Sequence, residues 1–241
     1  MAATTRDPET IPETKAAPKA VPPLENGDHL TRAEFERRYD AMPALKKAEL
    51  IEGIVYMPSP VSFGRHAMPH FDTIGWLSYY RMSTPGVAAG DSGSIRLDLD
   101  NMPQPDAFLF ILPVHGGEAH ISEDDYVEGA PEFVVEVASS SVSFDLYAKL
   151  HVYRRNAVRD YVVWRVQDSA IDWFVLRGGK FDRLSLTPEG LYKSVVLPSL
   201  WLDPAALLRG DMAAVGRIAQ QGVSSPEHAD FVAQLQRAAQ R

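Results

Sequence analysis

The sequence predicts one α/β domain over residues 28–202 with a tail at each end. Helix and strand signals alternate along this stretch, and nearly continuous apolar runs within it indicate buried strands. The 45% apolar share of the 241 residues is enough for a sizeable core. The proline-rich residues 1–27 lack apolar periodicity and predict a disordered N-terminal tail. The Ala- and Gln-rich residues 203–241 predict a helical C-terminal extension.

Four features predict helices. Thr31-Arg32-Ala33-Glu34 is typical of a capping box, in which the hydroxyl and the carboxylate satisfy free amides at a helix start. A second helix is expected over about 66–82, where a proline is tolerated in the first turn, and a third over about 143–156. The pairs Asp203-Pro204 and Ser225-Pro226 predict the starts of two C-terminal helices.

The strand signals lie between these helices. Residues 50–57 predict a hairpin, or a strand with a turn at Gly53. Alternating apolar residues predict a strand exposed on one face, and continuous apolar runs predict strands buried on both faces. The remaining predicted strands cover residues 95–99, 106–112, 133–137, 161–166 and 171–177, followed by a further pair over 181–186 and 192–197.

Composition excludes several function classes. The formal net charge is −8, of which −7 falls in residues 28–202, the opposite of a basic nucleic-acid footprint. The absence of cysteine excludes disulfide scaffolds, Cys-ligated zinc and thiol catalysis, and it fits a reducing cytosol, so we expect a cytoplasmic protein. No run approaches the roughly 20 apolar residues of a membrane helix, and the start MAATTRDPET lacks a signal-peptide pattern.

Common catalytic motifs are missing from the sequence. It contains no GxxxxGK[ST] or GxGxxG loop, and Gly90-Asp91-Ser92-Gly93-Ser94 is one residue wrong for a nucleophile elbow. His66 and His70 have the spacing of metal ligands on a helix, but Glu is absent from position 67 and Pro69 intervenes. We therefore interpret the two histidines as residues of a helix surface.

The most informative residue is Glu136, a carboxylate inside the apolar run Phe-Val-Val-Glu-Val. Burying it is costly unless it is paired, hydrogen-bonded or bound to a metal. Asp106 begins the neighbouring apolar strand, so the two carboxylates predict a site for a hard cation such as Mg²⁺. Lys149, on the helix that follows Glu136, is the expected positive group near the attacking water or the phosphate, and Glu49 is a possible third carboxylate.

Taken singly, most of these residues have simpler interpretations. Asp106 could cap a strand start, and Glu49 could be a solvated charge after two lysines. Asp145 and Lys149 could form an ordinary ion pair on a helix surface. Glu136 is the hardest to explain in this way, so the combination favours a site.

Several spaced motifs together resemble the Uma-type putative restriction endonuclease family, within the PD-(D/E)XK nuclease superfamily. The resemblance runs from about Leu30 to Leu208 and is specific because the motifs agree in order. They are Glu49-Leu-Ile-Glu-Gly-Ile-Val-Tyr-Met-Pro-Ser-Pro60, Pro105-Asp106, Pro131-Glu-Phe-Val-Val-Glu-Val-Ala-Ser139, Asp145-x-x-x-Lys149 with Tyr153 and Val158, and Tyr161-Val-Val-Trp164.

The resemblance implies a restriction-endonuclease-like mixed central sheet flanked by helices, a divalent-metal site for Mg²⁺ (or Mn²⁺), and a homodimer. By family position, Glu49 is the helix-side acid, Asp106 the central metal ligand, Glu136 the second ligand, and Lys149 the lysine. The place two residues after Glu136 holds Ala138, and the family's lysine often lies on the following helix instead. The Ser-rich stretch 139–144 replaces the family's usual Ser-Pro-Ser-Thr followed by basic residues.

These features favour a Mg²⁺-dependent endonuclease that attacks DNA phosphodiester bonds with a metal-activated water. The alternative is a catalytically inactive nuclease fold used as a binding or assembly module. An enzyme for another phosphate ester is less favoured because no nucleotide-binding loop is present. The acidic domain predicts weak DNA binding that is lost as salt rises. Trp173 and Phe174, interpreted as exposed aromatic residues, also indicate a homodimer, with plain core packing as the alternative.

Overall fold

The computed structural model describes residues 20–57 and 62–241. Helical segments, with single π or 3-10 turns labelled η, are α1 (Arg32–Asp40), η1 (Phe63–Ala67), α2 (Met68–Ser83), η2 (Pro113–His115), α3 (Val142–Phe144), η3 (Asp145–Lys149), α4 (Leu150–Arg155), α5 (Pro204–Leu208), α6 (Met212–Val223) and α7 (Pro226–Ala238). The strands are β1 (Glu49–Ile51), β2 (Ile54–Tyr56), β3 (Val87–Asp91), β4 (Ile95–Arg96), β5 (Ala107–Ile111), β6 (His120–Ile121), β7 (Val127–Glu128), β8 (Phe133–Ala138), β9 (Asp160–Arg165), β10 (Ala170–Arg177), β11 (Lys180–Arg183), β12 (Tyr192–Lys193) and β13 (Trp201–Leu202).

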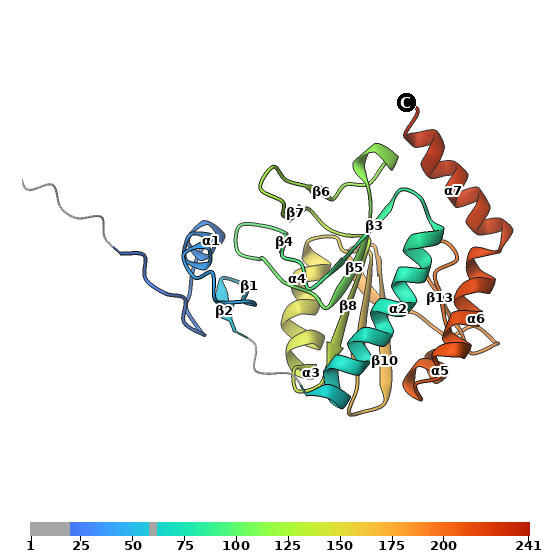
Figure 1. Ribbon diagram of the computed structural model, residues 1–241, viewed down its shortest axis with the longest axis horizontal. Coiled ribbons are helices and arrows are strands. Elements are labelled where there is room, and N and C mark those ends of the chain that lie inside the picture. The colour runs from blue at the N-terminus through green and yellow to red at the C-terminus, as the bar shows by residue number, and fades with distance from the viewer. Residues whose placement is uncertain (1–19, 58–61) are drawn as a thin grey trace, which may run out of the picture.

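A six-stranded mixed sheet forms the centre of the molecule, in the order β11-β10-β9-β8-β5-β3. Within this sheet only β8 and β9 are parallel, and α3, η3 and α4 connect them. The other neighbouring strands are antiparallel. Figure 1 shows α2 on one side of this sheet and α4 on the other. The predicted α/β fold, a mixed central sheet flanked by helices, is therefore confirmed.

Side chains of the central strands point alternately to the two faces of the sheet, where they belong to two apolar clusters. On one face Phe133 and Val135 pack with Trp76 of α2, and the C-terminal helices add Val215 and Phe231 to the same cluster. The opposite face packs against α4 through residues such as Val134, Tyr153 and Tyr161. Burial on both faces explains the continuous apolar runs of β5, β8 and β9.

The N-terminal part of the described chain forms a small lobe beside the sheet, on the side of α4 (Figure 1). Phe35 of α1 packs there with Leu50 and Val55 of the β1–β2 hairpin. Leu24 is also buried in this lobe, although the sequence predicts a tail to residue 27. The rest of the predicted disordered tail, residues 1–19, lies outside the described residues.

Several local predictions are confirmed. Thr31, Asp203 and Ser225 each cap a helix with their side-chain oxygen. The hairpin turns at Glu52 and Gly53, which have φ values of 52° and 75°. Positive φ at Gly53 is the reason glycine suits this turn.

Other predictions about the strands are wrong. The segments 181–186 and 192–197 do not pair with each other, because β11 pairs with β10 and β12 pairs with β13. Trp173 and Phe174 are 1% and 7% exposed, so they are core residues and provide no evidence for a homodimer. Within residues 20–57 and 62–241, we find no helix with the length and apolar character needed to cross a membrane.

Gly222→Ala is expected to destabilise the protein by about 1–3 kcal/mol. A Cβ atom at this buried position of α6 would overlap the backbone oxygen of Ser199, which cannot move without disturbing its loop. Gly216→Ala on the same helix is the control: its Cβ meets no atom within 4 Å and should add up to about 1 kcal/mol through helix propensity. Urea unfolding followed by circular dichroism gives both values, and equal stability of the two variants would contradict the expected overlap.

A second stability prediction concerns Asp160 on β9, which is fully buried. Ser194 donates to its Oδ2 at 2.5 Å, while Oδ1 has no partner among the described residues. Burial raises the pKa of Asp160 to about 7 from an ordinary value of 3.8. Because the folded-state pKa is raised, the favourable contribution is present below about pH 4 and is lost as pH rises toward 7. Asp160→Asn should therefore stabilise the protein at pH 8 by up to about 4 kcal/mol.

The same substitution should have little effect on stability near pH 4, where Asp160 is neutral in both folded and unfolded chains. Asp182→Asn, on the exposed side of β11, should change stability little at either pH. Thermal unfolding from pH 4 to 8 tests this, and an Asp160→Asn curve parallel to that of the wild type would contradict it.

Candidate active site

Glu136 lies at the middle of the candidate site. Its neighbours Val135 and Val137 bracket it on β8, and the strand alternation turns Glu136 toward the face that α4 covers. There Lys149 Nζ and the Tyr153 hydroxyl both donate to Glu136 Oε1, each at 2.9 Å. Glu136 is only 3% exposed, so these bonds provide much of the compensation that its burial requires.

Lys149 joins three acidic residues from different elements. Its Nζ lies 2.8 Å from Oε1 of Glu49, at the start of β1, and 3.9 Å from Oδ1 of Asp145. The backbone amide of Gln104 also donates to Glu49 Oε1, at 2.7 Å. Asp145 and Lys149 are 2% and 3% exposed, so their interpretation as an ordinary surface ion pair is wrong.

The charges of this cluster do not balance. Burial tends to lower the pKa of Lys149, but Glu136, Glu49 and Asp145 outweigh it and raise that pKa well above its ordinary value. Burial and the neighbouring acids raise the pKa values of Glu136 and Asp145, against the opposing effect of Lys149. One ammonium thus faces three buried carboxyl groups, which favours the retention of a proton or the binding of a further cation.

Asp106 lies beside Glu136 across the sheet. The antiparallel register pairs Ala107 of β5 with Val135 of β8, and continuing it by one residue puts Asp106 opposite Glu136. The amide of Val137 donates to Asp106 Oδ2 at 2.8 Å. Asp106 is buried, with 4% of its surface exposed. The register of β5 and β8 agrees with the prediction that the two carboxylates belong to adjacent strands.

Two histidines approach Asp106 from the start of α2. His66 Nε2 lies 3.5 Å from Asp106 Oδ1, and His70 Nε2 lies 2.8 Å from the Asp106 backbone oxygen. Lys47 Nζ is 3.6 Å from the same Oδ1. Burial alone would raise the pKa of Asp106, but His66 and Lys47 outweigh it and hold that pKa well below its usual range. The interpretation of His66 and His70 as surface histidines is therefore wrong; their spacing of four residues was the signal that could have identified them.

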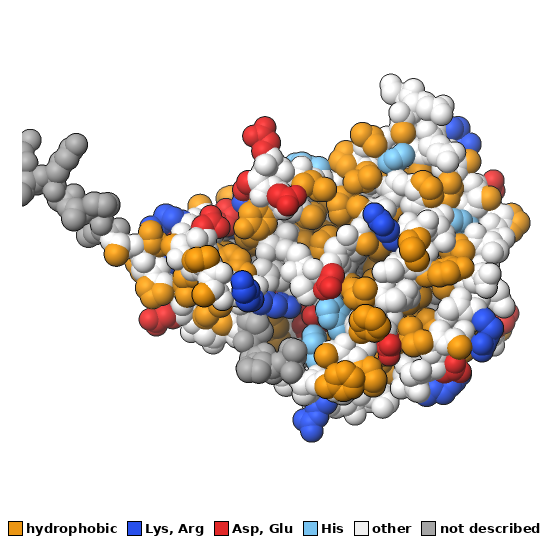
Figure 2. Space-filling model, viewed as in Figure 1, with side chains coloured by type: hydrophobic (Ala, Val, Ile, Leu, Met, Phe, Trp, Pro, Cys, Tyr) orange, Lys and Arg blue, Asp and Glu red, His pale blue; other side chains and the backbone are white. Residues whose placement is uncertain are grey.

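The predicted site residues thus occupy one place in the fold. Lys149 contacts both Glu49 and Glu136, while Asp106 joins them through its bond to the Val137 amide. Figure 2 shows basic, acidic and histidine side chains close together in the hollow between the N-terminal lobe and the sheet. Positive and negative groups are mixed here, in contrast to a continuous basic groove.

A divalent cation needs donor oxygens that hydrogen bonds and ion pairs leave free. Among residues 20–57 and 62–241, no three His, Cys, Asp or Glu side chains are grouped so that they could hold a metal ion by themselves. Mg²⁺ usually keeps several waters and takes only one or two carboxylates from the protein. Asp106 Oδ1 has no contact shorter than 3.5 Å from His66 or Lys47, and both bonds from Lys149 and Tyr153 to Glu136 go to Oε1. The oxygen donors therefore fit a hydrated hard cation.

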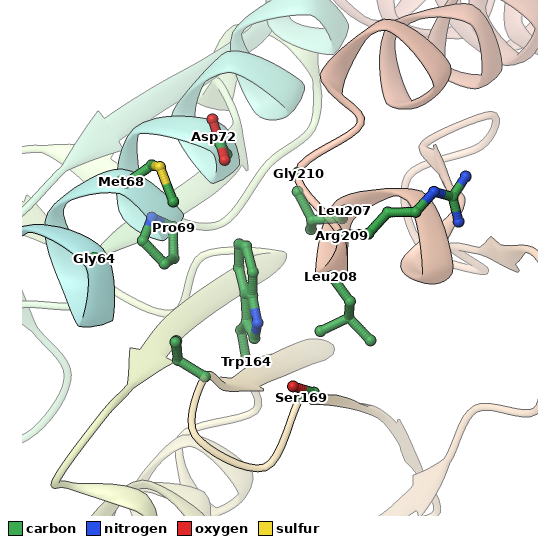
Figure 3. Close-up of a pocket in the computed structure, with 11 residues that line it drawn as sticks. Gly64, Met68, Pro69, Asp72, Trp164, Ser169, Leu207, Leu208, Arg209 and Gly210 are labelled. Carbon is green, nitrogen blue, oxygen red and sulfur yellow. The ribbon is translucent and has the colours of Figure 1, made fainter.

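A separate cavity of about 230 Å³ lies between the start of α2 and α5. Figure 3 shows the indole ring of Trp164 projecting into it between Pro69 and Leu208. Its lining in the described chain includes none of the four predicted site residues. Gly64 links the cavity to η1, the turn that carries His66, but the cavity is distinct from the carboxylate cluster.

Comparisons with known proteins identify the family of the chain and a similar fold. The chain matches the Uma2 family, described as "Putative restriction endonuclease", over residues 32–205. A crystal structure of a putative nuclease belonging to DUF820 from Anabaena variabilis has a similar fold, with a TM-score of 0.53 and 13% sequence identity. The similarity covers 72% of this chain and 96% of that one. A comparison with curated proteins gives no match. Since the family match covers most of its length, this chain belongs to the Uma2 putative restriction endonuclease family.

Proposed function

We propose that this protein is a divalent-metal-dependent endonuclease that hydrolyses phosphodiester bonds in DNA. The observation that carries the proposal is Glu136, a carboxylate on a buried strand, held by Lys149 and lying opposite Asp106. A purely structural core has little reason to bury this group of charges. Membership in the Uma2 family supports the same class of activity.

Asp106 and Glu136 would hold the cation, Mg²⁺ or Mn²⁺. Asp106 would use Oδ1, since Oδ2 accepts the Val137 amide, and Glu136 would use Oε2, since Oε1 accepts from Lys149 and Tyr153. A bound divalent ion lowers the pKa of a coordinated water and so supplies a nucleophile for the phosphodiester.

Lys149 supplies fixed positive charge beside that site. Its raised pKa keeps the ammonium protonated, so it acts as an electrostatic group and does not accept a proton from water. Glu49 holds the ammonium at 2.8 Å and is itself fixed by the Gln104 amide. We therefore assign Glu49 the role of a positioning residue for Lys149.

The alternative is a nuclease fold that binds or assembles without cleaving. The ion pairs of Lys149 with both Glu49 and Glu136 favour it, because they already satisfy part of the carboxylate charge. The net charge of −8 favours it too, since few basic groups are available to neutralise phosphates. A homodimer stays a prediction from the family resemblance, and light scattering at high micromolar concentration tests it.

Cleavage of supercoiled plasmid at low salt tests the proposal. Wild-type protein should cut with Mg²⁺ or Mn²⁺ and lose the activity when a chelator is added, because the metal generates the nucleophile. Cleavage should also fall as salt rises, because added cations compete with the basic groups of the protein for the phosphates, and the small number of such groups should make this dependence shallow. Ca²⁺ serves as a control ion of larger radius. A protein that binds plasmid but leaves it intact under every metal and salt condition would favour the binding module.

A further inference from the structure

The His66 ring has an unusual pair of neighbours. Its Nδ1 lies 3.0 Å from the backbone oxygen of Val137. A carbonyl oxygen can only accept a hydrogen bond, so Nδ1 carries the proton and donates it. In a neutral imidazole this leaves Nε2 with a free lone pair.

That lone pair faces another acceptor. Nε2 lies 3.5 Å from Asp106 Oδ1, a carboxylate oxygen that accepts hydrogen bonds. A neutral imidazole and a carboxylate are two acceptors, so a proton on Nε2 or a bound cation must lie between them. Without a cation the proton is favoured, because Asp106 raises the pKa of His66. The Val137 backbone fixes both partners, since its oxygen accepts a hydrogen bond from His66 Nδ1 and its amide donates to Asp106 Oδ2.

We infer that His66 Nε2 is a metal ligand together with Asp106 Oδ1, an inference that rests on the proposed metal-dependent function. A histidine that binds a metal usually donates its other ring N–H to a backbone carbonyl or a carboxylate, as His66 does to Val137. Ligands about 2.1 Å from a shared ion lie roughly 3.0–3.5 Å apart, which matches the observed separation. Lys47 approaches the same oxygen at 3.6 Å and would compete with the ion for it.

The local backbone presents His66 for this role. It lies on η1, a single π-helical turn before α2, and such turns often occur at functional sites. The His66 side chain is 20% exposed, so a hydrated ion can reach it.

His70 has a different role on the next turn. Its Nε2 lies 2.8 Å from the Asp106 backbone oxygen and 3.1 Å from Asp91 Oδ1. Both neighbours are acceptors, so Nε2 carries the proton and cannot offer a lone pair to a metal. His70 is therefore a positioning residue for the Asp106 backbone and a matched control for His66.

A nitrogen ligand changes the preferred metal. Imidazole suits Zn²⁺, Fe²⁺ and Ni²⁺, and oxygen ligands suit Mg²⁺, Ca²⁺ and Mn²⁺. As a first-row transition metal, Mn²⁺ nevertheless accepts an imidazole ligand more readily than Mg²⁺ does. The mixed set of His66 and Asp106 therefore favours Mn²⁺ over Mg²⁺ by more than carboxylates alone would.

Pulsed electron paramagnetic resonance of Mn²⁺ bound to the full-length chain tests the inference. The wild-type protein should show hyperfine coupling from one directly bound ¹⁴N. Labelling histidine with ¹⁵N should replace this coupling with one from ¹⁵N. His66→Gln should remove the coupling, weaken Mn²⁺ binding by about tenfold or more, and reduce the Mn²⁺-over-Mg²⁺ preference. His70→Gln should keep the nitrogen coupling.

The outcomes separate this inference from the function on which it rests. Wild-type protein that binds Mn²⁺ through Asp106, as shown by loss of binding in Asp106→Asn, but without ¹⁴N coupling would overturn the role of His66 alone. Wild-type protein that binds no Mn²⁺ would overturn both. Isotope labelling of the wild type keeps the test valid if His66→Gln folds poorly. Nitrogen coupling that disappears only in His70→Gln would show that the ligand is His70 and would overturn the inference about His66.

Discussion

Lys149→Met is expected to lower the free energy of unfolding by about 3–5 kcal/mol at pH 7. Methionine keeps most of the side-chain volume, so the change isolates the loss of the ammonium from the creation of a cavity. Without it, Glu49, Glu136 and Asp145 lose the one cation that the structure pairs with all three. Uncompensated buried carboxylates are costly, and they must take up protons for the chain to stay folded.

The pH dependence identifies the cause. In the variant the folded-state pKa values of Glu136 and Asp145 rise further above their unfolded values, so the deficit should shrink as pH falls from about 8 to 5. Adding Glu136→Gln to Lys149→Met should recover part of the loss, because one of the unpaired charges is removed. Lys180→Met removes an exposed lysine of β11 as a control and should change stability by less than about 0.5 kcal/mol. Urea unfolding of Lys149→Met that matches the wild type at pH 7 would disprove the pairing of Lys149 with the three acids.

The sequence predicts elements whose signals are local. Capping at Thr31, Asp203 and Ser225 depends on residues within one turn, and the hairpin at Gly53 depends on a positive φ. β3 escapes prediction because Val-Ala-Ala-Gly-Asp has no apolar alternation. It becomes a strand by pairing with β5, where Gly90 leaves room for the Phe108 ring. The pairing of β11 with β10 also escapes prediction, because the pairing partner of a strand depends on the arrangement of the whole sheet and not on its local sequence.

Some residues of the candidate site can likewise be predicted from local sequence, and others cannot. Glu136 stands out in the sequence because a charge within an apolar run contradicts its surroundings. His66 does not stand out, because its importance comes from a π turn and from Val137, a residue 71 positions away in the chain. The interpretation of Trp173 as exposed is wrong because its ring packs against Trp76 of α2 and Phe133 of β8, which lie far earlier in the chain. Contacts between distant segments are what sequence patterns cannot supply.

Asp106→Asn is expected to reduce metal-dependent plasmid cleavage to background while the protein stays folded. The amide keeps an oxygen that can accept from the Val137 N–H, so the local backbone should be preserved. The substitution removes the charge that attracts a hard cation, and it places an NH₂ group near the Lys47 ammonium and the His66 ring. We expect a stability loss of only about 1–2 kcal/mol, together with loss of Mn²⁺ and Mg²⁺ binding.

The measurement compares wild type, Asp106→Asn and Asp182→Asn, each purified in the same way, with Mg²⁺, with Mn²⁺ and with chelator. Asp182→Asn removes an equal charge from an exposed strand, so it should cut like the wild type. Calorimetry with Mn²⁺ on the same preparations shows whether lost cleavage follows lost binding. If Asp106→Asn cuts as well as the wild type, the activity comes from another site or from a contaminant, and the assignment of Asp106 is wrong. If it binds Mn²⁺ normally but does not cut, Asp106 acts on the water or the phosphate and the ion is held by other residues.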